Sequence, residues 1–411
     1  MGAAGSSPAA PQQAAPPAAP GAPERGRSYI APMPFDARPA ADTAGTAAAR
    51  DARAVGRWLL AVAAMVWVMV AIGGATRLTG SGLSIMEWAP VTGTVPPLSD
   101  AEWQRLYDLY RTIPQYALVN QGFGMEGFKR IFWLEWAHRF WGRAIGLAYA
   151  GGLLWFWLRG RVPAGLKPRL LLLLALGGLQ GAVGWFMVAS GFEADRTAVS
   201  PWRLVIHLGL ALALYAALLW TALGLILPRE EPRPDVPAPA WRSVRRQVLA
   251  AAWLLAAAML AGGFVAGIRA GFDYNTFPLM DGRLVPEGYW RLQPAWLNLA
   301  ENVAAVQFNH RLSATLAGLA AICAALAAWR RLPDGPARRA CLGLGAAVAL
   351  QYALGVAALL MVVPVWLGTL HQANAVLALT AALLALRLLP APAREPARSP
   401  PARPPPRPRA A

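Results

Sequence analysis

Long apolar runs are the feature that most restricts what this chain can fold into. Of its 411 residues, 56% are hydrophobic and 14% are charged. A helix needs about 20 mostly apolar residues to cross about 30 Å of hydrocarbon. The sequence therefore predicts an all-α integral membrane protein. Eight transmembrane helices are expected, at about 56–76, 131–158, 168–190, 202–227, 245–269, 302–329, 338–363 and 366–388.

The basic residues are distributed unevenly between the loops. They give the chain a net charge of +17 and gather at 159–169, 229–246, 330–339 and in the C-terminal tail. The intervening loops carry as much acid as base. By the positive-inside rule, both termini and the basic loops face the cytoplasm. The charge thus indicates membrane topology, and nucleic acid is not an expected partner.

The two ends of the chain differ in composition from the rest. Residues 1–55 are rich in Ala, Pro and Gly, and residues 390–411 are rich in Pro and Arg, which predicts disordered cytoplasmic tails. No cleavable signal peptide is expected, because the first apolar run starts near residue 56 and is long enough to remain as a helix. Acidic residues in the first tail argue against a mitochondrial presequence. We therefore expect a multi-pass protein of the bacterial inner membrane.

All four histidines lie in apolar segments, near the helix ends that the charge pattern places on the periplasmic side. They are His138, His207, His310 and His371. A polar ring inside hydrocarbon is costly, so an intramembrane histidine is a functional candidate. Two facing neutral imidazoles are what a six-coordinate haem iron requires. The pattern favours two haem sites, and the alternative is that the histidines only join helices by hydrogen bonds.

The chain contains an internal repeat that includes the histidines. The matching segments are GGATRLTGSGL (73–83) with GGFVAGIRAGF (262–272), WAHRFWGR (136–143) with FNHRLSAT (308–315), LQGAVGWFMV (179–188) with LQYALGVAAL (350–359), and IHLGLALAL (206–214) with LHQANAVLAL (370–379). An even number of helices in each copy keeps both copies in the same orientation. The repeat predicts two tandem, pseudo-symmetric four-helix bundles, each with an inward-facing histidine pair.

The expected domains follow from this repeat. The N-terminal bundle covers 56–228 and the C-terminal bundle covers 245–389, with a cytoplasmic linker at 229–244. The glycines within 73–82 and 262–271 would let helices, or a flat macrocycle, approach the backbone closely.

The two copies differ beside the first histidine of each pair. Glu135 precedes His138 by three residues, which places both on one helix face, whereas Gln307 at the matching place cannot ionise. A carboxylate beside a haem edge can accept or deliver protons. The asymmetry suggests one reactive haem site and one that only holds a haem or relays electrons. The alternative is that Glu135 is an interfacial acid paired with Arg139 or Arg143.

Four arginines lie near the external helix ends: Arg77, Arg139, Arg269 and Arg311. Because arginine pairs bidentately with carboxylates, haem propionates are candidate partners. Snorkelling to lipid phosphate explains the same positions and stays open as an alternative.

Together these motifs resemble the haem A synthase family over about residues 56–388. The likeness rests on IGGATRLTGSGLSIMEWAPVTGTVPPL, EGFKRIFWLEWAHRFWGR, His207, AGGFVAGIRAGFDYNTFPLM, FNHR and TLHQANA. The resemblance implies oxidation of the C8 methyl group of haem O to a formyl group, which gives haem A for cytochrome oxidase.

The resemblance also implies a division of roles between the two pairs. His138 and His207 would flank the substrate haem O, and His310 and His371 would ligate a resident haem B. Glu135 matches the acid of the family's Glu-x-x-His motif. The implied catalytic residues are therefore Glu135, His138 and His207.

One feature departs from some bacterial members of that family, which carry cysteine pairs in external loops. This chain has only Cys323 and Cys341, both at or within predicted helices near the cytoplasmic side. It resembles the longer-looped proteobacterial and mitochondrial-like branch, and a mechanism that uses loop thiols is not expected. We expect both cysteines to be small buried hydrophobes without a disulfide.

Two other functions remain open on the residues alone. A dihaem, quinol-linked electron carrier of the cytochrome b type would keep both haems six-coordinate and would not need Glu135. A transporter or haem exporter would need a substrate path, and the predicted helices carry no further charges in their middles to mark one. For the enzyme, the expected partners are haem O and the lipid bilayer, with an electron acceptor, a haem O synthase and a second copy of the chain as further candidates.

Overall fold

The computed structural model describes residues 40–390, and within that range it consists of helices and connecting segments, with one isolated β-bridge. Ten α-helices are described: α1 (Ala40–Leu78), α2 (Asp100–Tyr110), α3 (Pro114–Leu118), α4 (Gly124–Leu158), α5 (Lys167–Ala189), α6 (Pro201–Ile226), α7 (Ala238–Gly267), α8 (Val303–Arg331), α9 (Pro336–Leu360) and α10 (Val365–Leu388). The prediction of an all-α chain is confirmed. Most of both predicted tails, 1–55 and 390–411, lies outside the described residues, and α1 begins earlier than the apolar run alone indicated.

Seven of the predicted spans are confirmed as helices that are long and apolar enough to cross a membrane. They are α1 from Ala47 onward and α5 to α10. The eighth, α4, is 35 residues long but is not among the seven. Its middle carries Glu135, Arg139 and Arg143 together with glycines and tryptophans, which lower its mean hydropathy. Whether α4 crosses the membrane therefore stays a prediction.

The starts of the long helices follow local sequence rules. Proline stands in the first turn of α5, α6 and α9, where its missing N–H leaves no hydrogen bond unmade. Asn302 caps α8, because its side-chain oxygen accepts hydrogen bonds from the N–H groups of Ala304 and Ala305. The starts of α6 and α8 place His207 and His310 within about two turns of the beginning of their helices, and His371 lies equally close to the beginning of α10.

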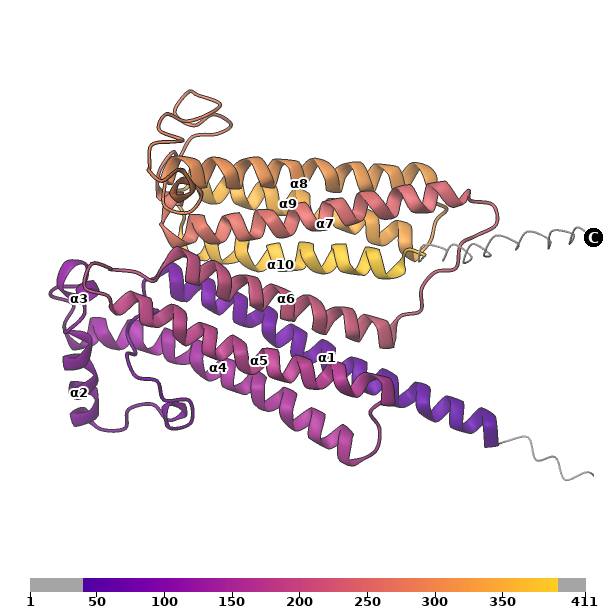
Figure 1. The fold of residues 1–411 in the computed structure, drawn as a ribbon, viewed down its shortest axis with the longest axis horizontal. Helices are drawn as coiled ribbons and strands as arrows, with labels where there is room; N and C mark the ends of the chain where they lie inside the picture. Colours follow the sequence, from indigo (N-terminus) through magenta and orange to yellow (C-terminus); the bar gives the residue numbers. More distant parts are fainter. Residues whose placement is uncertain (1–39, 391–411) are drawn as a thin grey trace, which may run out of the picture. The chain divides into compact units, whose positions relative to one another are not determined.

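The long helices form two groups. α7, α8, α9 and α10 contact one another in a ring, and Figure 1 shows them on one side, with α1, α4, α5 and α6 on the other. We call these groups the C-terminal half and the N-terminal half. They meet where α6 contacts α7 and α10.

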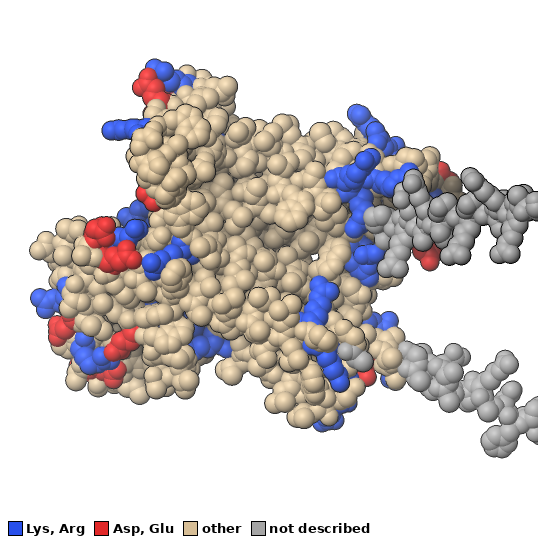
Figure 2. Space-filling model, in the orientation of Figure 1, with Lys and Arg blue, Asp and Glu red and all other residues tan. Residues whose placement is uncertain are grey.

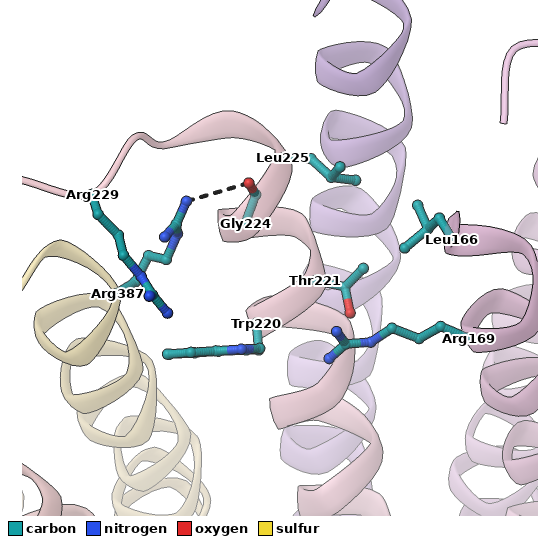
Figure 3. Close-up of a pocket in the computed structure, with 8 residues that line it drawn as sticks. All are labelled: Leu166, Arg169, Trp220, Thr221, Gly224, Leu225, Arg229 and Arg387. Carbon is teal, nitrogen blue, oxygen red and sulfur yellow. Dashed lines mark hydrogen bonds between the residues drawn. The ribbon is translucent and has the colours of Figure 1, made fainter. Parts of the chain in front are cut away.

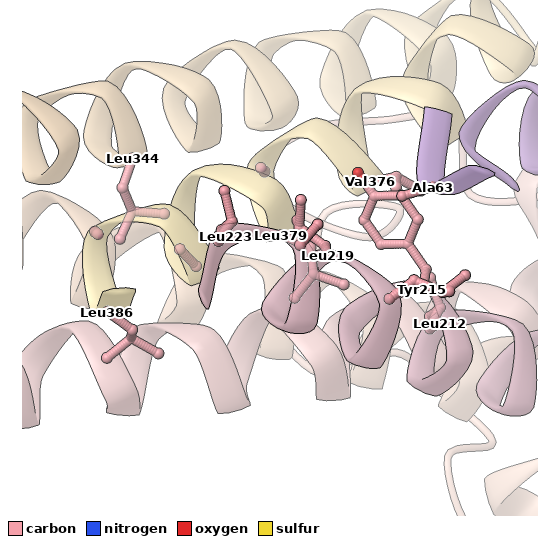
Figure 4. Close-up of a cluster of buried hydrophobic side chains, with 14 of the residues drawn as sticks. Ala63, Leu212, Tyr215, Leu219, Leu223, Leu344, Val376, Leu379 and Leu386 are labelled. Atoms are coloured by element: carbon pink, nitrogen blue, oxygen red, sulfur yellow. The ribbon is translucent and has the colours of Figure 1, made fainter. Parts of the chain in front are cut away.

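A continuous apolar core joins the two halves. Figure 4 shows side chains of α6, including Leu212 and Leu219, beside Val376 and Leu379 of α10. In lipid, such close packing holds helices together without a hydrophobic driving force. Polar links cross the same interface, among them the 2.7 Å hydrogen bond between the hydroxyls of Tyr215 and Thr380.

A second contact between the halves brings α1 against α10 beside His371. Gln372 Nε2 donates to the carbonyl of Val70 at 2.9 Å, and Trp67 Nε1 donates to the carbonyl of Ala373 at 2.9 Å. A Cβ added at Gly74 would lie 2.6 Å from Gln372 Oε1, so a side chain there would displace the Gln372 amide. The residues next to His371 are thus fixed to the N-terminal half.

The segment between α1 and α4 packs onto the first turns of α4. Its apolar side chains, among them Leu83 and Tyr110, form a second buried cluster with Phe128 and Phe132 of α4. Gln115 Nε2 donates to the carbonyl of Gly80 at 3.0 Å and ties α3 to the end of α1. This packing presents the residues just after α1 to the side of α4.

The surface charges differ between the two ends of the long helices. Figure 2 shows Lys and Arg gathered at the end where α5, α7 and α9 begin, and a mixture of both signs at the opposite end.

Cys341 is buried in α9, as expected, and both cysteines are free. The expectation that Cys323 is also buried is wrong, because it lies exposed on the surface of α8.

Candidate functional site

Each of the four histidine rings packs against a glycine of a neighbouring helix. A Cβ built on Gly73 would lie 3.1 Å from Cε1 of His138, and one built on Gly184 would lie 3.0 Å from Cε1 of His207. In the C-terminal half, a Cβ on Gly262 would lie 3.0 Å from Cε1 of His310, and one on Gly355 would lie 2.8 Å from Cε1 of His371. In the N-terminal half, a glycine of α1 contacts the histidine of α4, and a glycine of α5 contacts the histidine of α6. In the C-terminal half, α7 and α8 form such a pair, and so do α9 and α10. Two of these glycines, Gly73 and Gly262, belong to the motifs in which the sequence predicted close approach.

The rings of His310 and His371 lie close together, at a centroid separation that fits two imidazoles on one metal ion. Their centroids are 6.5 Å apart and their planes lie at 86°. A metal–imidazole bond is about 2 Å, so two imidazoles on one ion have centroids about 6 Å apart. His310 Nδ1 lies 3.0 Å from the carbonyl oxygen of Ala258, and an N–H donated there leaves Nε2 free as a ligand.

Two glutamines that the sequence analysis did not single out contact the second histidine of each pair. Gln180 Nε2 lies 3.2 Å from His207 Nδ1, and Gln351 Nε2 lies 3.1 Å from His371 Nδ1. An amide nitrogen donates, so each contact orients its imidazole ring with Nδ1 as the acceptor. A signal was present in the sequence, since both copies place the glutamine four residues before the contact glycine, in LQGAVG and LQYALG.

His138 differs from the other three histidines. Its Nδ1 is buried and has no hydrogen-bond partner among the described residues. Native structures leave few buried polar atoms without a partner, and such an atom often marks a functional position. The ring of His138 is therefore held by packing alone, against Gly73.

Glu135 is buried and fully hydrogen bonded, with 2% of its surface exposed. Its Oε2 accepts from Ser84 Oγ at 2.7 Å and from the N–H of Ile85 at 2.9 Å. Its Oε1 accepts from Arg139 Nη2 at 2.6 Å and from Arg139 Nε at 3.0 Å. Of the two arginines considered as partners, Arg139 makes the pair, whereas Arg143 donates to the carbonyls of the segment after α1.

Gln307 occupies the matching place, but it donates hydrogen bonds to the adjoining loop where Glu135 accepts them. Its Nε2 donates to the carbonyls of Ala270 at 2.7 Å and Asp273 at 2.6 Å. Its Oε1 accepts from Arg311 Nη2 at 2.8 Å. The loop after α1 therefore offers donors to a carboxylate, whereas the loop after α7 offers carbonyls that a carboxylate would repel.

The four arginines divide into two kinds. Arg139 and Arg311 bind the residues just described and also the carbonyls of the adjoining loops. Arg77 donates one bond, to the carbonyl of Gly267 at 2.9 Å, and its Nε is buried without a partner among the described residues. Arg269 lies near enough to Arg77 for the two like charges to repel. Arg77 and Arg269 thus place positive charge between the ends of α1 and α7.

An ion pair fixes the loop that surrounds Glu135. Arg105 donates to the two carboxylate oxygens of Glu87 at 2.8 and 3.1 Å. The Arg105 hydrogen bond lowers the pKa of Glu87 from its ordinary value. The pair therefore stabilises the fold above the unfolded-state pKa of Glu87, and this contribution is lost as pH falls through the lowered value. Because both side chains are about half exposed, it amounts to about 0–1 kcal/mol.

Comparison with known proteins places the chain in a family. The model of a cytochrome oxidase assembly protein family (COX15-CtaA) matches residues 56–383. The chain belongs to this family. A relative from Granulibacter bethesdensis, named "Heme A synthase", is 58% identical over 335 residues, covering 82% of this chain and 87% of the relative. Another of that name, from Rhodospirillum centenum, is 48% identical over 354 residues, covering 86% and 92%. The resemblance inferred from the motifs is confirmed.

The hydrogen bonds of Glu135 can be tested at Ser84. In Ser84→Ala the buried carboxylate loses one of its donors, and a hydrogen bond to a charged group contributes about 1.5–3 kcal/mol. We expect the free energy of unfolding of the purified protein in detergent to fall by about that amount. The same change made in a Glu135→Gln background should have a smaller effect. An equal loss in both backgrounds would show that the hydroxyl does not act through the carboxylate.

Proposed function

We propose that this oxidoreductase converts haem O to haem A between His138 and His207, and that it keeps a haem B between His310 and His371. The family membership and the relatives named haem A synthase support the reaction, in which a methyl group becomes a formyl group by successive oxidations. The observation that carries the division of roles is a buried, hydrogen-bonded carboxylate beside only one of the two histidine pairs.

The geometry of the second pair supports a permanently held haem. His310 and His371 are spaced for one iron, and both rings are fixed, by Ala258 and by Gln351. Haem B, when bound there, supplies a one-electron carrier. The neutral Gln307 beside it cannot ionise, and its amide N–H groups bind two carbonyls and hold the adjoining loop instead.

The first pair is arranged for a substrate that must arrive and leave. His138 has a free Nδ1, so its ring is less constrained than that of His310. Glu135 can take up or release a proton at Oε2, where the Ser84 hydroxyl is already hydrogen bonded. Arg139 holds Oε1 and keeps the carboxylate oriented. We infer that Glu135 carries the protons removed during the oxidations toward the loop after α1.

Arg77 and Arg269 are the best candidates for binding haem propionates. They lie between the two halves with few internal partners, and arginine binds carboxylates bidentately. Arg139 and Arg311 are less suited, because most of their donors already bind Glu135, Gln307 and loop carbonyls.

We also propose the membrane arrangement that the repeat predicts. α4 is the eighth span, since it is 35 residues long and contacts α1 through Trp58 with Ala148 and Trp141 with Met65. Two pseudo-symmetric bundles, 56–228 and 245–389, then stand side by side, joined by the linker 229–244. Both termini face the cytoplasm of a bacterial inner membrane, and the histidines lie toward the periplasm.

The role of Glu135 is tested by Glu135→Gln. Loss of acid–base catalysis lowers rates by about 10²–10⁴. We expect membranes with this variant to accumulate haem O or a partly oxidised product, measured by extracting the haems, while haem B is retained. Glu193→Gln is the matched control: Glu193 also pairs with arginines but is exposed, and this variant should make haem A normally. Normal haem A from Glu135→Gln at equal protein level would make Glu135 structural only.

The contact between Gly355 and His371 is tested by Gly355→Ala. The added Cβ would lie 2.8 Å from the ring, closer than real contacts allow, so the ring must move. We expect the purified variant to lose most of its low-spin haem absorption. Gly343→Ala, on the same helix with nothing within 4 Å of the added Cβ, should keep the haem. Equal haem in both variants would contradict the placement of haem B at His371.

The proposed orientation is tested with a reporter that is active only in the cytoplasm. Fusions after Arg161, Arg242 or Arg338 should be active, because they follow or lie in the basic loops. Fusions after Gly122 or Gly282 should be silent. Activity at Gly122 would invert the topology and move the histidines to the cytoplasmic side.

A further inference from the structure

A pocket lined by arginines lies far from the histidines, where α5 begins and α6 and α10 end. Arg169 comes from α5, Arg387 from α10, and Arg229 from the segment that follows α6. Figure 3 shows Trp220 of α6 between them, with Arg229 and Arg387 on one side and Arg169 on the other. The remaining lining, which includes Leu166 and Leu225, is largely apolar.

The positive charge in this pocket is not balanced by the protein. No acidic side chain lines the pocket, and within residues 40–390 none of its three arginines forms an ion pair. Arg229 lies close enough to Arg387, and to Arg245 on α7, for the like charges to repel. Bringing these cations together is unfavourable unless an anion joins them.

One of the arginines also holds the pocket in shape. Arg387 donates to the carbonyls of Leu223, Gly224 and Leu227 at the end of α6. The Leu223 carbonyl also accepts from the N–H of Leu227, and Arg387 adds bonds to the carbonyls of Gly224 and Leu227 at the exposed end of the helix. Arg169 and Arg229 are exposed and free to approach a ligand.

We propose that this pocket binds the phosphate headgroup of an anionic membrane lipid. Arginine clusters recognise phosphate oxygens, and basic pockets between membrane helices on the cytoplasmic side favour anionic headgroups. The position at the ends of membrane-crossing helices, the tryptophan and the apolar lining together suit a lipid at the hydrocarbon boundary better than a free anion. The inference rests on the membrane spans and on the proposed orientation, and not on the haem chemistry.

The test uses the full chain purified in a mild detergent and follows its thermal unfolding. Mixed micelles with phosphatidylglycerol should raise the Tm saturably, whereas phosphatidylcholine and inorganic phosphate alone should not. Arg169→Gln combined with Arg229→Gln should raise the half-saturating lipid concentration by about tenfold or more. Arg387 is left intact because it closes the end of α6.

A matched control separates this site from general charge attraction. Arg242→Gln combined with Arg246→Gln removes two exposed charges at the same end of the helices, outside the pocket. This variant should respond to phosphatidylglycerol like the unaltered chain. Equal weakening in both double variants, or an equal response to phosphatidylcholine, would overturn the site. The same saturable shift with phosphate alone would overturn a lipid as its occupant.

Discussion

The contact between a histidine ring and a glycine backbone is the interaction on which the rest of the structure depends. It occurs four times, once for each histidine, and it sets how closely α1 approaches α4, α5 approaches α6, α7 approaches α8, and α9 approaches α10. A larger residue at any of these glycines would displace the ring. Polar groups inside hydrocarbon need partners. By fixing the position of each ring, the contact also fixes where its nitrogen atoms can meet a ligand.

The two halves share the same histidine–glycine frame, and they differ in the loops that pack beside the first histidine of each half. Donors from Ser84 and Ile85 stabilise a carboxylate at position 135, whereas the carbonyls of Ala270 and Asp273 require an amide at position 307. The halves are also joined next to His371, where Gln372 binds the backbone of α1 one turn from the glycine that contacts His138. The two histidine pairs are therefore held at fixed relative positions, as electron transfer between two haems would require.

Much of this could be predicted from the sequence, because apolar runs and charged loops report on the membrane. The histidines, the repeat and the asymmetry at Glu135 were all visible as patterns. The partners of Glu135 were not, since Ser84 lies 51 residues away and reaches it only through the packing of the segment after α1. The arginine pocket was equally hidden, because Arg169, Arg229 and Arg387 come together only through the crossing of α5, α6 and α10. Whether α4 is the eighth span could not be decided from hydropathy, because its middle carries charged residues, of which Glu135 and Arg139 pair with each other.

The central claim is that each histidine pair holds its own haem and that only the first holds the substrate. The most direct measurement is the haem content of two purified double variants, expressed with a source of haem O. In His138→Ala with His207→Ala, we predict haem B at the level of the unaltered protein and no haem O or haem A. In His310→Ala with His371→Ala, we predict that haem B is lost. Loss of haem B from the first variant, or its retention in the second, would contradict the account.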